Sequence, residues 1–228
     1  MKRSKLSSAL EALCCLLFSL TAAIAVPILW RGWYYGQIGS LGLVEQTGWS
    51  METIRGAFDA VMDYLVKGGP FSTGELAWSE SGMSHFADCR TLFRLDFIVL
   101  AVTAALLLLF LIRALRAPRE EGGPLSPALC ALFITLALFL VFGVWAVVDF
   151  EGLFAAFHGL CFPGKTNWIF DARADQIILI LPEAFWARTA ALVAGLTLAI
   201  EALLALLTAL LRKVRTPRSV YEELSAAR

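Results

Sequence analysis

The sequence predicts an all-α fold in which four transmembrane helices form a bundle and the two longer loops form a small helical and irregular domain outside the membrane. Hydrophobic residues make up 59% of the 228 residues, and charged residues make up only 17%. A chain this apolar does not fit one water-soluble core, and it is too long for a single membrane anchor. We therefore expect residues 1–228 to form a single polytopic membrane domain.

Four apolar segments are long enough to cross a bilayer, since about 20 helical residues at about 1.5 Å each span the hydrocarbon core. The first follows a basic N-terminus and is longer than the apolar region of a typical signal peptide, so we interpret it as a retained span. The long loops between the spans are residues 31–94 and 149–186. The predicted spans are residues 9–30, 95–115, 127–148 and 187–211.

Lysine and arginine residues are distributed unequally between the two sides of the predicted bundle. Eleven lie in the two tails and the short loop after the second span, whereas eight lie in the two much longer loops. Because cytoplasmic segments are enriched in these residues, both termini are predicted to be cytoplasmic and both long loops extracytoplasmic. The eleven are Lys2, Arg3, Lys5, Arg113, Arg116, Arg119, Arg212, Lys213, Arg215, Arg218 and Arg228.

The first long loop opens with the glycine-rich and aromatic sequence RGWYYGQIGSLG, which is typical of irregular structure at a membrane interface. Apolar residues then recur at spacings of three and four over residues 51–67. This spacing predicts an amphipathic helix that Ser50 caps and the Gly-Gly-Pro sequence at 68–70 ends. Residues 79–95 are expected to form a helix that leads into the second span.

The second long loop is predicted to contain a short helix, a turn at residues 163–164 and a second apolar helix that Pro182 ends. Polar chemistry is concentrated in its part from Phe157 to Trp186. That part holds a histidine, a lysine, three carboxylates and two tryptophans between two membrane spans. We therefore expect the functional site to involve this loop.

Both histidines of the chain, His85 and His158, lie on predicted helices of the long loops, close to a span. Imidazole takes up and returns a proton near neutral pH, so a converging pair would suit acyl chemistry. The two long loops make up nearly half of the chain. The position of the histidines alone therefore does not decide the function.

Two cysteines lie close to the histidines in sequence. Cys89 follows His85 by four residues and Cys161 follows His158 by three, so each pair can share a helix face. A Cys2His2 zinc site and a cysteine–histidine nucleophilic dyad are therefore alternatives. The usual zinc-ligand spacings are absent, and small buried thiols are the simplest interpretation. We expect no metal and no cofactor.

Residues 159–166, GLCFPGKT, match the P-loop pattern G-x-x-x-x-G-K-[ST]. That loop binds phosphate between a β-strand and a helix, whereas this segment lies in a predicted extracytoplasmic turn, so we expect no nucleotide. The net charge of zero gives no indication of nucleic-acid binding. Glu201 lies inside the fourth span, where carboxylates are often functional, but a single carboxylate does not make an ion pathway.

Two segments of the long loops resemble the signatures of a known family. The sequence SHFADCR at 84–90 resembles a motif of the form H-M-x-D-V-[KR], and the second loop contains W-I-F-D-x-x-x-D-x-I-I and L-P-E-x-F-W. Both are similar to hallmarks of the lipoprotein intramolecular transacylase family of bacterial four-span membrane proteins. The sequence departs from the motif at Phe86 and Cys89, where the family more often has methionine and valine, and both are packing positions.

The resemblance implies an enzyme of the bacterial cell membrane whose partners are diacylglyceryl-modified lipoproteins and membrane lipid. It would move the sn-2 acyl chain from the glycerol oxygen to the α-amine of the N-terminal cysteine, giving a lyso-form lipoprotein. It also implies that His85 and His158 are the catalytic residues, and it leaves the oligomeric state open. Candidate supporting or substrate-binding residues are Tyr64, Asp88, Arg90, Lys165, Asn167, Trp168, Asp171 and Asp175.

The residue chemistry fits this implied reaction. Two histidines can share the proton transfers, although the sequence does not say which of them is the base. Asp88, three residues after His85, is placed to orient an imidazole, and Lys165 and Asn167 are candidate oxyanion donors or substrate anchors. Because the substrate tethers both reacting groups, a covalent acyl-histidine is unnecessary.

Two functions of other classes are alternatives. A non-enzymatic four-span scaffold or partner-binding protein would tolerate replacement of both histidines. A small transporter would need polar residues lining the bundle, and Glu201 is nearly the only one.

Overall fold

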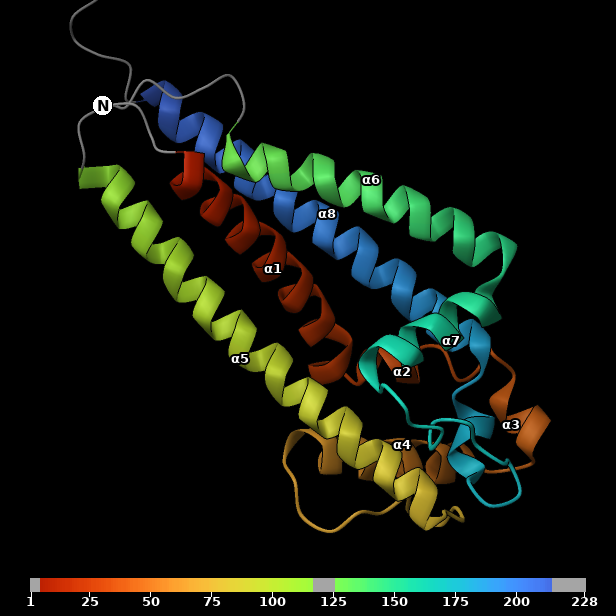
Figure 1. The fold of residues 1–228 in the computed structure, drawn as a ribbon. Helices are drawn as coiled ribbons and strands as arrows, with labels where there is room; N and C mark the ends of the chain where they lie inside the picture. The colour runs from red at the N-terminus through yellow and green to blue at the C-terminus, as the bar shows by residue number, and fades with distance from the viewer. Residues whose placement is uncertain (1–4, 117–125, 215–228) are drawn as a thin grey trace, which may run out of the picture.

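The computed structural model describes residues 5–116 and 126–214, and every regular element in them is helical. Four long helices lie side by side as a bundle, with shorter helices gathered at one end (Figure 1). Six of the basic residues used to predict the orientation, Lys2, Arg3, Arg119, Arg215, Arg218 and Arg228, lie outside the described residues. The long helices are α1 (Lys5–Leu29), α5 (Glu80–Arg116), α6 (Pro127–Val148) and α8 (Glu183–Val214).

Each of these four helices is long and apolar enough to cross a membrane, which confirms the predicted fold class. The predicted span at residues 127–148 coincides with α6, and α1 ends one residue before the predicted end of the first span. Two spans begin earlier than predicted, because α5 and α8 extend without a break into the preceding loops.

Helix α5 is much longer than a membrane requires. Its 37 residues span about 55 Å, compared with about 30 Å for the hydrocarbon core of a bilayer. Its N-terminal part therefore projects beyond the bundle, where it packs against α4 (Met51–Val66). This confirms the prediction of a helix that leads directly into the second span.

Helix α1 is central to the bundle, since it contacts each of the other three long helices and has the largest share of buried residues. Small side chains of Cys15, Ala128 and Ala131 are buried together between α1 and α6. Small residues allow close helix packing in a membrane, where the hydrophobic effect does not drive helices together. The outer faces of α5, α6 and α8 expose large apolar side chains, as expected for contact with lipid.

Glu201 of α8, the carboxylate predicted inside the fourth span, is completely buried in the bundle. Its Oε1 accepts hydrogen bonds from Ser19 of α1 at 3.1 Å and from Thr135 of α6 at 2.8 Å. Its Oε2 is buried without a hydrogen-bond partner in the described part of the chain. The carboxyl group thus joins three of the four spans.

The shorter elements form one outer domain at the end of the bundle (Figure 1). The glycine-rich start of the first loop is more regular than predicted, because it forms one short helix, and a second short helix follows directly after it. The amphipathic helix α4 is present as predicted, with Ser50 accepting a hydrogen bond from the amide of Thr53 at 3.0 Å and Gly68 at a φ of 91° after its end. The elements of the first loop are α2 (Gly32–Tyr35), α3 (Leu43–Thr47) and α4.

The second loop supplies α7 (Phe150–Cys161) and the 3-10 helix η1 (Gln176–Ile180). The helix predicted before Pro182 is therefore only a five-residue 3-10 helix, because the apolar run between Asp175 and Pro182 is too short for an α-helix of several turns. The predicted turn at residues 163–164 is present, with Gly164 at a φ of 73°.

The two loops share one hydrophobic core. Tyr34 of α2 is 1% exposed and stacks on Phe58 of α4, with the ring centroids 3.9 Å apart. Its hydroxyl donates a hydrogen bond of 2.9 Å to the carbonyl oxygen of Ile180 in η1. Burial of one such large side chain contributes roughly 1.5–3 kcal/mol, so the loops stabilise each other as a single unit.

Hydrogen bonds also join the second loop to the start of α5. The amide of Gln176 donates to the carbonyl of Ala77 at 3.0 Å, and the Gln176 side chain accepts from the Ala77 amide at 2.8 Å. Buried Asp175 accepts from both the amide and the hydroxyl of Ser79, each at 2.8 Å. Gly82 permits this approach, since a Cβ there would lie 2.1 Å from the Asp175 carboxylate. The first turns of α5 are thereby fixed relative to the second loop.

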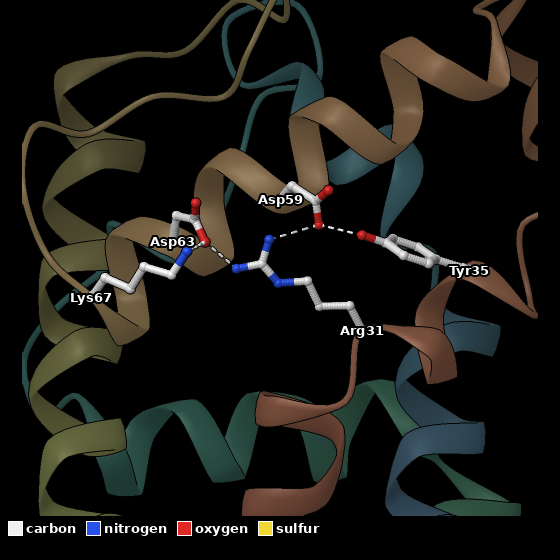
Figure 2. A network of polar contacts seen from close by, with 5 residues as sticks. All are labelled: Arg31, Tyr35, Asp59, Asp63 and Lys67. Carbon is white, nitrogen blue, oxygen red and sulfur yellow. Dashed lines mark hydrogen bonds and ion pairs between the residues drawn. The ribbon is translucent and has the colours of Figure 1, made fainter.

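Polar and charged side chains hold α4 against α2 and the residue that precedes it (Figure 2). Arg31 donates to Asp59 at 2.9 Å and to Asp63, while Lys67 pairs with Asp63 at 3.0 Å and the Tyr35 hydroxyl donates to Asp59 at 2.6 Å. The hydrogen bond from Arg31 is the largest cause of the lowered pKa of Asp63. We call these five residues the Arg31 network.

Candidate active site

His85 lies in the second turn of the projecting part of α5 and is 6% exposed. Its Nε2 lies 3.3 Å from the Sγ atom of Cys89, one turn further along the same helix. Its Nδ1 is buried and has no hydrogen-bond partner in the described residues. One ring nitrogen is thus turned toward a thiol, and the other remains available to a ligand.

His158 lies on α7 and is 7% exposed. Its Nδ1 lies 2.8 Å from the carbonyl oxygen of Phe154, one turn earlier. Because a carbonyl oxygen only accepts, Nδ1 carries the hydrogen, and the lone pair of the neutral ring is on Nε2. Burial is the main cause of the lowered pKa of His158, and the hydrogen bond to Phe154 partly opposes it. Neutral His158 therefore presents Nε2 as a base.

The structure brings the two histidines together from elements that are far apart in the sequence. Their ring centroids lie 5.8 Å apart, and the ring planes are tilted by 33°. Because like charges repel, two buried imidazoles this close do not both take up the second proton that makes the ring positively charged at neutral pH. We call His85 and His158 the histidine pair.

Aromatic rings surround the histidine pair. Phe162 and Phe170 lie edge-on to the imidazole of His85, at centroid distances of 4.9 and 5.4 Å. The ring of Trp168 stacks on the imidazole of His158 with the centroids 4.6 Å apart, and the ring centroid of Phe154 lies 4.1 Å from that of His158. Such rings exclude water, and the low dielectric constant they create strengthens polar interactions inside the site.

Asp88, one turn after His85, pairs with the second loop. Its carboxylate accepts from the Lys165 ammonium at 2.5 Å and from Asn167 Nδ2 at 3.0 Å, and the same Nδ2 lies 3.3 Å from the hydroxyl of Ser84. In the described part of the chain, Asp88 thus binds the second loop instead of orienting an imidazole by a hydrogen bond. Its pairing fixes Lys165 and Asn167 beside α5.

The remaining predicted site residues shape the outer domain. The Arg90 guanidinium lies 5.1 Å above the ring of Tyr64 and joins α5 to α4. Asp171 accepts a hydrogen bond of 2.9 Å from the amide of Arg173 in a turn, and Asp175 binds the start of α5. Through these contacts, the four predicted residues bind parts of the outer domain other than the histidine pair.

Two alternative chemistries have little geometric support. Across residues 5–116 and 126–214, no group of three or more His, Cys, Asp or Glu side chains is arranged to hold a metal ion. The P-loop match begins at the end of α7 and continues into a turn, and the described residues preceding it form no β-strand. The backbone context that binds phosphate is therefore different here.

A family model described as lipoprotein intramolecular transacylase Lit matches residues 9–186. This chain belongs to the Lit family. Its fold is similar to that of the membrane-integral Lit from Bacillus cereus, with a TM-score of 0.83 and 22% sequence identity over 92% of this chain and 96% of that chain. Comparison with curated protein sequences gives no match.

Two variants of Bacillus cereus Lit have the same fold. In one a histidine is replaced by arginine, and its TM-score is 0.75 with 23% identity over 91% of this chain and 92% of that chain. In the other a histidine is replaced by alanine, and its TM-score is 0.78 with 22% identity over 92% of this chain and 94% of that chain.

Membership of the Lit family confirms the resemblance found in the sequence. The chain is a multi-pass membrane protein and an acyl-transfer enzyme of the class that acts on lipoproteins. The scaffold and transporter alternatives are accordingly not favoured.

Sequence reasoning missed most of the aromatic shell around the histidine pair. Phe154 precedes His158 by four residues in an apolar helix, so the helical spacing alone could have placed it beside the imidazole. Phe162 and Phe170 carry no such local signal. Their positions depend on how the second loop turns after α7 and returns toward α5.

Proposed function

We propose that this chain moves the sn-2 acyl chain of a diacylglyceryl-cysteine lipoprotein to the α-amine of that cysteine, giving a lyso-form lipoprotein. The observation that carries the proposal is the buried histidine pair, 5.8 Å apart, at the end of a four-span bundle of the Lit family. Ester-to-amide transfer requires a base for the amine proton and a hydrogen-bond donor for the oxyanion. The pair can supply both.

His158 is suited to the proton transfer. Its Nδ1 hydrogen is held by the Phe154 carbonyl, which leaves Nε2 free to accept a proton. After the substrate ammonium has lost one proton to solvent, its nitrogen attacks the ester carbonyl carbon. The second proton passes to Nε2 and then to the glycerol oxygen as the carbon–oxygen bond breaks. The overall reaction converts an ester and an amine into an amide and an alcohol.

His85 is suited to stabilise the negative charge on the ester oxygen. When the Cys89 thiol donates to Nε2, the hydrogen of the neutral imidazole is on Nδ1, the buried nitrogen without a partner. An N–H group directed at the oxyanion in a water-excluded site typically contributes about 10²–10³ in kcat.

The surface of α7 supports access from the lipid phase. Phe157 and Leu160 are 53% and 82% exposed on this short helix. Moving acyl chains into water would cost about 0.8 kcal/mol for each CH2 group, so the chains stay in the bilayer during transfer. We therefore expect an opening between spans that leads to the histidine pair.

We also infer that the outer domain and the site lie on the extracytoplasmic side. The excess of lysine and arginine in the opposite segments supports this orientation. The start of α1 and the end of α8 lie together at the end of the bundle away from the outer domain (Figure 1). In a chain whose own cysteines are replaced, a cysteine at Ser72 should be labelled from outside and one at Arg119 only from inside. The reverse pattern would contradict this topology.

The reaction itself is tested with purified protein and a synthetic diacylglyceryl-cysteine peptide. Because the acyl chain stays within one molecule, the total mass should not change, and tandem mass spectrometry should find one acyl chain on the N-terminal fragment. A protein with both histidines replaced by alanine is the control. A product heavier by one acyl chain would show transfer between molecules and would contradict the proposal.

A further inference from the structure

Asn167 has an amide group whose orientation is fixed and whose oxygen is unused. Its Nδ2 donates to the carboxylate of Asp88 at 3.0 Å and to the hydroxyl of Ser84 at 3.3 Å. A carboxylate only accepts hydrogen bonds, so the nitrogen must be the amide atom that faces Asp88. The oxygen, Oδ1, is buried and has no hydrogen-bond partner in the described residues.

A buried acceptor without a donor is unfavourable, and native proteins keep few of them. This one belongs to the surroundings of the histidine pair. Asn167 precedes Trp168, whose indole stacks on His158 at 4.6 Å, and its partner Asp88 lies one helical turn after His85. Asn167 is therefore linked to both sides of the site, directly before the tryptophan that stacks on His158 and, through Asp88, to the helix that carries His85.

The hydrogen-bond pattern also determines what Asn167 can offer a substrate. Both Nδ2 hydrogens are directed at partners within the protein, so the side chain cannot donate to an oxyanion without breaking one of these bonds. Polarisation of the amide by the Asp88 carboxylate strengthens Oδ1 as an acceptor. The site thus offers a donor-bearing ligand a neutral acceptor of increased strength.

We propose that Oδ1 of Asn167 accepts a hydrogen bond from the α-ammonium or α-amine of the substrate's N-terminal cysteine. This inference rests on the proposed function, in which that nitrogen is the nucleophile. The amine is the hydrogen-bond donor that the reaction brings into the site. Asn167 then holds the nitrogen while His158 takes its proton, and it acts as a binding residue for the amine instead of an oxyanion donor.

The test uses a pair of ligands that cannot react. One is a cysteine lipopeptide whose glycerol carries two ether-linked alkyl chains, so that it has no ester to transfer, and the other is the same compound without its α-amine. Both are measured as competitors of the transacylation reaction and by direct binding to protein in detergent. Loss of a hydrogen bond to a charged group weakens binding by roughly tenfold to a hundredfold.

Wild-type protein should prefer the amine-containing ligand, and Asn167→Leu should reduce that preference by the same factor, leaving only the contribution of His158 Nε2. Thr91→Ala, which changes an exposed hydroxyl on the same helix as Asp88, should keep the wild-type preference. If Asn167→Leu does not fold, Asn167→Ala removes the amide oxygen with less bulk and leaves no hydroxyl acceptor in its place. It should reduce the preference in the same way.

The outcomes separate this inference from the proposed function. If wild-type protein makes the N-acyl product but either Asn167 variant keeps the full preference for the amine, the inference is wrong and the function stands. The same conclusion follows if wild-type protein shows no preference between the two ether ligands. If wild-type protein makes no N-acyl product, the proposed function itself is wrong.

Discussion

The outer domain contains two polar clusters of opposite character. In the Arg31 network, each of the five side chains pairs with another member, and the Asp63 side chain is 45% exposed (Figure 2). Around the histidine pair, by contrast, two buried atoms have no partner within the described chain: Nδ1 of His85 and Oδ1 of Asn167. A satisfied network holds secondary structure in place, whereas unsatisfied buried groups are available to a substrate. The first cluster is thus suited to stability and the second to binding and chemistry.

The largest expected effect comes from the histidine pair. His85→Ala and His158→Ala should each lower kcat by about 10³-fold or more, because each removes a group that acts in the transition state. The double variant should be little worse than either single variant, as expected for residues that act as a unit. Product formation followed by mass spectrometry gives the rates, and thermal unfolding shows whether each variant is folded.

Replacement by an amide separates the two roles. An asparagine at position 85 keeps an N–H donor, whereas a glutamine at position 158 cannot accept and return a proton. His85→Asn should therefore retain more activity than His158→Gln. Equal losses would contradict the assigned roles, and strictly additive losses in the double alanine variant would contradict a shared mechanism.

The pKa of His158 tests whether this buried histidine is the neutral base. Burial disfavours the charged ring and lowers its pKa, so the neutral form should persist below the ordinary value of about 6.5. The chain has only two histidines, and NMR of protein labelled in the imidazole rings resolves both, with His158→Ala giving the assignment. We expect a midpoint below 6.5 and a hydrogen on Nδ1 of the neutral ring. A midpoint above 6.5, or a hydrogen on Nε2, would contradict the proposed base.

The same shift has a consequence for stability. The unfolded chain binds a proton at His158 at a higher pH than the folded chain does. The free energy of unfolding is therefore unaffected by this group above a pH of about 6.5. It decreases as the pH falls from there through the lower pKa of His158 in the folded chain. Loss of stability in this range should be smaller in His158→Ala.

The spans and the amphipathic helix α4 were predictable because each depends on a local pattern of apolar residues. The pairing of His85 with His158 was not available from such a pattern, and the expectation came from the resemblance to the Lit family. The hydrogen bonds of Asp175 to Ser79 and of Asp88 to Asn167 join residues about 80 or more positions apart. Helical periodicity gives no information on contacts of that kind. The sequence therefore suggested Asp88, Asn167 and Asp175 as site residues, but not the hydrogen bonds that they make.

The Arg31 network should affect stability and leave the chemistry nearly unchanged. Arg31→Ala leaves the carboxylates of Asp59 and Asp63 one helical turn apart without their shared cation. Partly exposed ion pairs contribute about 0.2–1 kcal/mol each, so losing two of them should cost roughly 0.4–2 kcal/mol, and less at high salt. Thermal unfolding measures this loss.

Arg173→Ala, which removes an exposed side chain of the second loop, is the matched control and should unfold like the wild type. At a temperature where Arg31→Ala is folded, its transacylation rate should lie within a few-fold of the wild-type rate. A hundredfold loss of activity without unfolding would show that the network takes part in the site, and it would remove the contrast between the two clusters.

The smallest expected effect on activity comes from replacing the two thiols near the histidine pair, Cys89 and Cys161. Cys89 gives the Nε2 atom of His85 its partner at 3.3 Å, and Cys89→Val removes that partner while keeping an apolar side chain of similar size. A thiol–imidazole contact is weak, so its loss should shift the imidazole between its two neutral tautomers and slow the reaction by less than about tenfold. Cys161→Ala should have no measurable effect, and chelators should not change the activity of the purified protein. A loss of a hundredfold or more in Cys89→Val, or inhibition by chelators, would restore thiol or zinc chemistry as the better explanation of the site.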